Sequence, residues 1–276
     1  MATDSAYAAA RLVAALALTT VGACGMYIVP VVLPAVQAEF GIARAQAALP
    51  YSLMMICFGL GGLMMGRIAD RFGVMVPLLI GGAGIGLGFA IASMTGSFTA
   101  FMLAHGIFIG LLGSSAMFAP LIADTSLWWV RRRGIAVAIC ASGNYLGGTI
   151  WPPVIQHFIE QVGWRQTYLS AGIFCFVAAT ALALCMRRRP PIAVPAAGGS
   201  AAAKRISRPF GLSTAQAQTL LCIAAVACCV AMSMPQVHIV AYCADLGYGA
   251  ARGAQMLSVM MAFGIASRLI SGVICD

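Results

Sequence analysis

GRIADRFG, residues 66–73, is a charged, glycine-bounded segment that we expect to form a turn between two long apolar runs. Its opening frame, Gly-x-x-x-Asp, returns at the end of the sequence as Gly272–Asp276. The second copy stops before the positions that would match Arg71 and Gly73. An internal copy of this kind indicates two related halves, of which the second is expected to be incomplete.

The composition identifies lipid as the solvent of this chain. Of its 276 residues, 62% are hydrophobic and only 8% are charged, and the mean hydropathy is +0.96. So much apolar surface cannot be buried in a water-soluble core. The apolar runs reach about 20 residues without two-residue alternation, which favours helices over a barrel. We therefore expect an all-α fold, a polytopic transmembrane helical bundle.

The net charge of +9 is a topology signal rather than a sign of nucleic-acid binding. The basic residues gather in a few connections between apolar runs, whereas Arg44, Arg165 and Arg252 stand on the opposite side. This bias predicts a cytoplasmic N-terminus and a cytoplasmic central loop. The ten cysteines lie in or beside apolar runs without metal-ligand spacing, so we expect packing roles, no metal and no cofactor.

We expect eight membrane spans, six before the central loop and two after it. Residues 1–186 should form an N-terminal six-helix bundle, 187–215 a basic cytoplasmic linker, and 216–276 the first two helices of an incomplete second bundle. A six-plus-six protein would need about four more helices. The expected spans are Leu12–Val36, Ala47–Ile68, Val74–Met94, Phe98–Ile122, Ile135–Phe158, Thr167–Met186, Ala217–Cys243 and Ala254–Cys275.

The segment at 66–73 resembles the signature loop between helices 2 and 3 of the major facilitator superfamily. Within that superfamily the sequence is similar to the bacterial relatives of the monocarboxylate transporters and the oxalate/formate antiporters. The matching segments are LPAVQAEFG (33–41), WWVRRRGIA (128–136), Gly163-Trp164-Arg165, His238-Ile239-Val240 and Arg268-x-x-x-Gly272.

The sequence departs from that branch in two places. Carboxylate carriers of the animal type place an acid one turn before the helix-8 arginine, where this chain has Gly264. Helix 1 lacks the acidic, glycine-tryptophan motif of the branch and reads GACGMY at 22–27.

Arg268 is the strongest candidate for a substrate-binding residue. It lies midway along the last apolar run, where a charge costs about 2.5–3.5 kcal/mol on insertion scales. We therefore expect it to face a cavity or a partner, and its planar fork suits bidentate binding of a carboxylate. The alternatives are an ion pair inside the bundle or snorkelling to an interface. The resemblance implies that this arginine binds the substrate carboxylate.

Four further polar side chains within the spans could line the same cavity: Tyr27, Asn144, Tyr145 and His238. His238 could hydrogen-bond an anion or accept a proton, or it could be a packed histidine. Asn144 could equally bridge two helices. We expect interfacial roles for His105 and His157.

A second group of residues is expected to govern switching between inward and outward states. Asp70 could accept hydrogen bonds from a neighbouring helix N-terminus, and Arg71 could reach Asp124 at the cytoplasmic end of helix 4. The alternative is a solvated turn that only sets topology. The candidate switch residues are Gly66, Asp70, Arg71, Gly73, Asp124, Gly272 and Asp276.

The sequence contains no nucleophile-base-acid order, paired carboxylates or phosphate-binding loop that would suggest an enzyme or the use of ATP. We expect a secondary active transporter of small, monocarboxylate-like organic anions in a bacterial inner membrane, either proton-coupled or an exchanger. One alternative is an exporter of uncharged or cationic compounds. The other is a truncated membrane protein that transports nothing, since full function should need the missing C-terminal helices.

Overall fold

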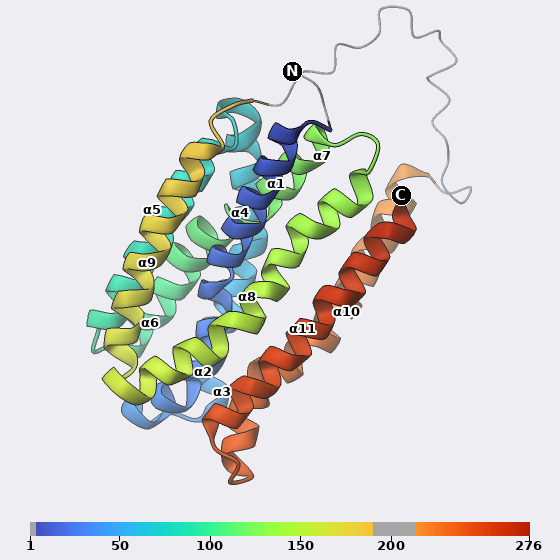
Figure 1. The fold of residues 1–276 in the computed structure, drawn as a ribbon. Coiled ribbons are helices and arrows are strands. Elements are labelled where there is room, and N and C mark those ends of the chain that lie inside the picture. The colour runs from blue at the N-terminus through green and yellow to red at the C-terminus, as the bar shows by residue number, and fades with distance from the viewer. Residues whose placement is uncertain (1–3, 190–212) are drawn as a thin grey trace, which may run out of the picture.

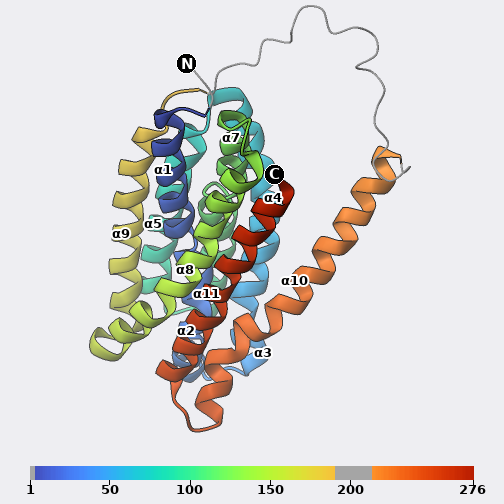
Figure 2. The same ribbon diagram turned by 45° about the vertical axis from the view of Figure 1, so that its right-hand side comes forward.

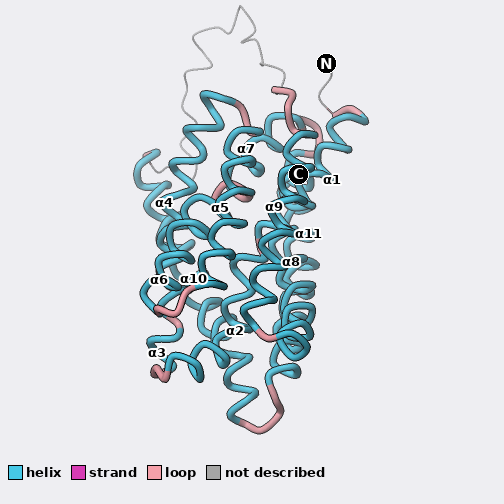
Figure 3. The backbone as a smooth tube through the Cα atoms, turned by 90° about the vertical axis from the view of Figure 1, so that its left-hand side faces the viewer, coloured by secondary structure: helices cyan, strands magenta, loops and turns pink. Residues whose placement is uncertain are grey.

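The computed structural model describes residues 4–189 and 213–276, and this part of the chain is built from helices and short connections without a strand (Figure 3). The expected all-α membrane fold is therefore confirmed. Most of the expected central linker, residues 190–212, lies outside the described residues.

The elements follow one another with few residues between them. They are α1 (Ala6–Gly22), α2 (Cys24–Phe40), α3 (Arg44–Ala47), α4 (Leu49–Phe72), α5 (Met75–Met94), α6 (Phe98–Leu103), the π-helix η1 (Ala104–Ser114), α7 (Ala119–Trp128), α8 (Arg133–Val162), α9 (Trp164–Cys185), α10 (Thr214–Asp245) and α11 (Ala250–Cys275).

By length and composition, seven helical segments of the described chain are long and apolar enough to cross a membrane. One of them joins α1 and α2, and another runs from α6 through η1 to α7. The remaining expected span corresponds to α8, which has 30 residues. It contains four polar or charged side chains, Asn144, Gln156, His157 and Glu160. Sequence and structure therefore agree on the run of long helices.

The helices fall into two groups in space. Helices α1 to α9 pack together, and we call them the N-terminal bundle; α10 and α11, the C-terminal hairpin, lie against one side of it along α8 (Figure 1). Figure 2 shows α10 leaning away from the bundle at its N-terminal part. Accordingly, nearly every described side chain of α10 before Gln236 is exposed, whereas Gln236, Val237 and Val240 are buried.

The molecule has two distinguishable ends. Helix α1 begins and α11 ends at the same end of the bundle (Figure 1). The arginines at 67 and 71 and the run at 131–133 belong to that end, so we call it the basic end. The α8–α9 and α10–α11 connections lie at the opposite end. The alternation of helix directions is that of a polytopic membrane protein.

Helix α2 lies at the centre of the N-terminal bundle. Every residue from Cys24 to Leu33 is buried, so this stretch contacts other helices on all sides rather than lipid. The interruption at Ala23 coincides with a close neighbour, because the Ser114 hydroxyl donates a hydrogen bond to the Gly22 carbonyl at 3.0 Å. The first span is thereby tied to η1 near its midpoint.

The π-helix η1 contains His105, for which the predicted interfacial role is wrong. His105 is fully buried, with Nδ1 2.8 Å from the Phe101 carbonyl oxygen and Nε2 3.2 Å from the Tyr168 hydroxyl. It packs inside the bundle rather than at a membrane interface. His157 is exposed near the opposite end and contacts Gln161.

A polar clasp at the opposite end holds three helices of the bundle together. The Glu39 carboxylate on α2 accepts hydrogen bonds from Trp164 Nε1 at 2.5 Å and Arg165 Nη2 at 2.6 Å at the start of α9. Arg165 Nη1 also donates to the carbonyls of Ser93 and Thr95 at the end of α5, both at 2.8 Å. The Gly163-Trp164-Arg165 segment thus has a structural role, because its hydrogen bonds join α9 to α2 and α5.

Candidate functional site

A buried chain of hydrogen bonds joins the C-terminal hairpin to the N-terminal bundle at mid-depth. Gln236 Nε2 on α10 donates to the Tyr27 hydroxyl on α2 at 2.9 Å. The same hydroxyl donates to Asn144 Oδ1 on α8 at 3.0 Å. Tyr27 and Gln236 are 2% and 7% exposed, so in a membrane these polar groups depend on one another for partners. The arrangement brings two of the expected substrate-binding residues, Tyr27 and Asn144, into direct contact.

Arg268 lies on the face of α11 that packs against α8. Its guanidinium Cζ is 5.3 Å from the centre of the Tyr145 ring, and the side chain is half-buried. Met261, two turns earlier on the same face, lies beside the Tyr27 hydroxyl, with its sulfur 3.2 Å away. Arg268 and the hydrogen-bonded chain therefore occupy one seam between the hairpin and the bundle. The arginine is turned toward the bundle rather than toward lipid.

His238 is two residues beyond Gln236 on α10. It is half-buried, and its Nδ1 atom is buried without a hydrogen-bond partner among residues 4–189 and 213–276. An unpaired imidazole nitrogen in a span has unused capacity to donate or accept a hydrogen bond.

The repeated Gly-x-x-x-Asp frame closes the seam at the basic end. The Asp276 carboxylate accepts hydrogen bonds from the backbone amides of Gly134 at 2.5 Å and Ile135 at 2.8 Å. These amides belong to the first turn of α8, where unpaired N–H groups and the helix dipole favour an anion. Gly272, one turn earlier, packs so closely on Ala138 that a Cβ atom there would overlap it. We call this contact the inner latch.

The first copy of the frame is positioned differently. Residues 66–72 continue α4 to its end at Phe72, so the expected turn is confined to Gly73 and Val74. The expectation of an eight-residue turn was wrong because this segment keeps helical hydrogen bonds up to the Gly73 amide, which donates to the Ala69 carbonyl. Asp70 and Arg71 are exposed, and the Arg71 guanidinium lies over the Phe72 ring at 5.2 Å.

Asp124 has a different partner from the expected one. It forms a bidentate ion pair with Arg11 on α1, with Nε to Oδ2 at 2.9 Å and Nη2 to Oδ1 at 3.0 Å. The expected pairing with Arg71 was wrong because Arg11 enters the bundle and stacks on Trp128, 4.9 Å from the ring centre. Both charges are buried, so the pair belongs to the interior of the N-terminal bundle.

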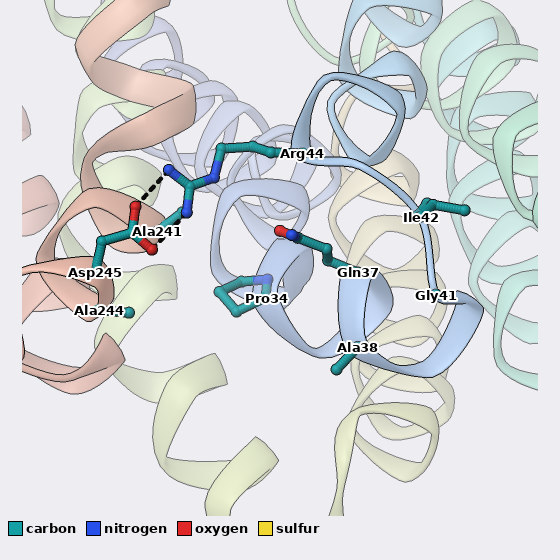
Figure 4. A pocket seen from close by; sticks show the side chains of 9 residues that line it. All are labelled: Pro34, Gln37, Ala38, Gly41, Ile42, Arg44, Ala241, Ala244 and Asp245. Carbon is teal, nitrogen blue, oxygen red and sulfur yellow. Dashed lines mark hydrogen bonds and ion pairs between the residues drawn. The ribbon is translucent and has the colours of Figure 1, made fainter.

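A pocket of about 420 Å³ opens at the opposite end, between the α2–α3 corner and the end of α10. Figure 4 shows Arg44 and Asp245 pointing toward each other across it. Arg44 Nη2 donates to Asp245 Oδ1 at 2.6 Å, and Nη1 lies 2.5 Å from Oδ2. We call this bidentate pair the outer clasp, because it joins the bundle to the hairpin at the end away from the inner latch.

Sequence reasoning missed three residues that make these contacts: Gln236, Asp245 and Arg11. An amide directly after Pro235 in an apolar run was an available signal for Gln236, since such a group needs a partner in lipid. Asp245 and Arg11 stand at span ends, where charges are ordinary, and their partners are 201 and 113 residues away in the chain. Only the packing of the helices reveals these pairs.

Comparisons with known proteins agree with this architecture. The model of the Major Facilitator Superfamily matches residues 15–276. A solved peptide transporter, POT, in complex with alafosfalin has a TM-score of 0.55 and 17% identity, covering 81% of this chain and 45% of that one. At this identity the likeness concerns the fold alone.

Curated relatives include "MFS-type transporter 1" of Ophiocordyceps sp., 28% identical over 82% of this chain and 48% of that protein. "Monocarboxylate transporter 6" of Mus musculus is 33% identical over 41% of this chain and 24% of that protein. "Fujikurins efflux protein" of Gibberella fujikuroi is 31% identical over 60% of this chain and 36% of that protein. The chain thus matches half or less of the length of these three relatives. It belongs to the Major Facilitator Superfamily of membrane transporters.

Proposed function

We propose that this chain is part of a secondary active transporter that moves small organic anions by alternating access. The observation that carries the proposal is the position of Arg268, on the face of α11 against α8 and in one seam with Tyr27 and Asn144. A guanidinium at that depth favours an anionic partner, and its fork matches a carboxylate. The similarity to a monocarboxylate transporter supports the same class of substrate.

The two contacts across the seam supply the switch in this proposal. The N-terminal bundle and the C-terminal hairpin act as parts of two halves that rock around the central site. Inward opening releases the Asp276 carboxylate from the α8 N-terminus. Outward opening releases Arg44 from Asp245. Asp70 and Arg71, with Gly66 and Gly73 in the same segment, take the equivalent place in the first copy of the frame.

The proposal extends to the coupling ion and to the orientation in the membrane. His238, with its unpaired Nδ1, is the candidate to take up a proton if the anion is carried by proton symport rather than exchange. The bias of basic residues toward one end supports a cytoplasmic position for that end, in a bacterial inner membrane.

Uptake into proteoliposomes tests the proposal. The full-length gene product should accumulate radiolabelled pyruvate, and methyl pyruvate, which lacks the negative charge, should compete poorly. Arg268→Ala should abolish pyruvate uptake, because the carboxylate loses its bidentate donor. Undiminished uptake by this variant would exclude the proposed role of Arg268.

Export of uncharged or cationic compounds is a second candidate, favoured by the similarity to a fungal efflux protein. Arg268 would then be a structural residue stacked on Tyr145. In that case a hydrophobic cation such as ethidium should be transported and should compete better than pyruvate. The competition assay separates the two candidates.

A further inference from the structure

The contact between Arg268 and Tyr145 leaves the donors of the guanidinium unused. The guanidinium lies over the Tyr145 ring, with Cζ 5.3 Å from the ring centre. No residue of the described chain accepts a hydrogen bond from Arg268 or forms an ion pair with it. Stacking occupies the π face of a guanidinium, whereas a carboxylate binds in its plane. Both interactions can therefore be made at once.

The position of the Tyr145 ring is fixed by a glycine on the facing helix. A Cβ atom at Gly264 would lie 2.5 Å from Tyr145 Cε1 and would overlap the ring. Any other residue at position 264 would push the ring away from α11. Because Gly264 is one helical turn before Arg268, the notch at this glycine sets the ring directly beside the guanidinium.

A second glycine makes the arrangement reciprocal. A Cβ atom at Gly148 on α8 would lie 2.6 Å from Met261 Cγ on α11. Each helix thus inserts one side chain at a glycine of the other, Tyr145 at Gly264 and Met261 at Gly148. Close helix approach at small residues is the main source of packing in lipid. The two contacts hold α8 and α11 close together on either side of the level of Tyr145 and leave the ring little room to move at Gly264.

We propose that Tyr145 is the positioning residue of the anion site: seated at Gly264, it stacks on the Arg268 guanidinium and leaves the in-plane N–H groups for a substrate carboxylate. The inference rests on the proposed function, because it takes Arg268 as the carboxylate-binding residue. Fixing the side chain before binding reduces the entropy lost when the anion binds, which raises affinity. The aromatic ring also keeps the charge within the seam when no anion is bound.

The test compares initial rates of pyruvate uptake by proteoliposomes of the full-length protein carrying Tyr145→Phe, Tyr145→Leu or Gly264→Ala. Phe keeps the ring face and should leave KM within about twofold of wild type. Leu fills much of the notch without a π face and should raise KM about tenfold, corresponding to about 1.4 kcal/mol, with Vmax nearly unchanged. Gly264→Ala displaces the ring and should raise KM in the same direction. Tyr242→Leu, an exposed tyrosine on α10, is the matched control.

Each result has a defined meaning. A KM of Tyr145→Leu equal to that of wild type, together with lost uptake in Arg268→Ala, would overturn the role of Tyr145 and leave the proposed function standing. Equal KM values for Tyr145→Phe and Tyr145→Leu, both raised, would assign the effect to the hydroxyl and overturn the stacking argument. Normal uptake by Arg268→Ala would remove the proposed function itself. If Tyr145→Leu does not yield folded protein, Gly264→Ala carries the test by the same KM criterion.

Discussion

The described part of the chain contains two bidentate arginine–aspartate pairs that differ in burial and in the parts they join. Arg11–Asp124 lies inside the N-terminal bundle, with side chains 3% and 7% exposed. Arg44–Asp245 joins the bundle to the hairpin, with side chains 37% and 51% exposed. The nitrogen–oxygen distances do not indicate which pair matters more for stability, because the exposed pair is the shorter, at 2.5 Å against 2.9 Å. Burial does indicate it, because the loss of one partner leaves an uncompensated charge in the buried pair but a hydrated charge in the exposed pair.

The proposed rocking mechanism accounts for this difference in burial. A contact within one moving part can be buried permanently, so its charges must stay paired through the cycle. A contact between parts must open in every cycle, and an exposed pair can exchange its partner for water at little cost. The inner latch is also a contact between parts. When it opens, water can replace the Asp276 carboxylate as the hydrogen-bond acceptor of the two backbone amides.

The largest effect is expected from breaking the buried pair. Arg11→Met leaves the Asp124 charge buried without its partner, and the loss of stability should be about 3–5 kcal/mol. The thermal midpoint of the detergent-solubilised protein, followed with a dye that reacts with buried thiols such as Cys24, Cys140 and Cys175, measures it. The double variant Arg11→Met/Asp124→Leu is the control, because an apolar pair should recover most of the midpoint. An unchanged midpoint in Arg11→Met would mean that the two pairs do not differ as described.

A smaller and local effect is expected at the inner latch. Asp276→Ala removes the acceptor of the Gly134 and Ile135 amides, which an N-terminal capping carboxylate typically stabilises by about 0.5–2 kcal/mol. Hydrogen–deuterium exchange of the peptide covering 130–140 should therefore become about tenfold faster. Asp70→Ala is the matched control and should leave this peptide unchanged, since Asp70 is exposed on α4. Equal exchange in the wild type and Asp276→Ala would rule out the latch.

The smallest effect on stability is expected at the outer clasp. Arg44→Ala or Asp245→Ala should change unfolding free energy by no more than about 1 kcal/mol, because both side chains are solvated. The transport rate should change instead, since a weakened clasp shifts the population toward outward-open states. The exchanged pair Arg44→Asp/Asp245→Arg should restore the wild-type rate at low salt. A loss of stability as large as that of Arg11→Met would contradict the comparison.

Much of the fold could be predicted from the sequence because membrane spans leave a strong signal in apolar length. Hydrogen bonds to a helix N-terminus were predicted for Asp70, whereas the structure shows them at Asp276, in the second copy of the frame. The local form of residues 66–73 was not predicted, because a helix can continue through charged residues when one glycine at its end is enough to stop it.

The partners of charged and polar groups were harder to predict than their presence. Arg11 is one of the basic residues whose bias predicts the topology, yet it enters the bundle and pairs with the Asp124 carboxylate in place of the expected Arg71. Gln236 meets Tyr27 across 209 residues of chain. Such pairs depend on the rotation and register of packed helices, which hydropathy does not encode. The sequence could therefore indicate Arg268, Tyr27 and Asn144 as candidates but not the seam that unites them.

Binding of a carboxylate by Arg268 is most directly tested by equilibrium binding of radiolabelled pyruvate to the purified full-length protein, with methyl pyruvate as the uncharged competitor. Wild type should bind pyruvate and prefer it to the ester, whereas Arg268→Lys, which keeps the charge but loses the fork, should weaken pyruvate binding by about tenfold or more. Equal pyruvate affinity in wild type, Arg268→Lys and Arg268→Ala would contradict the account.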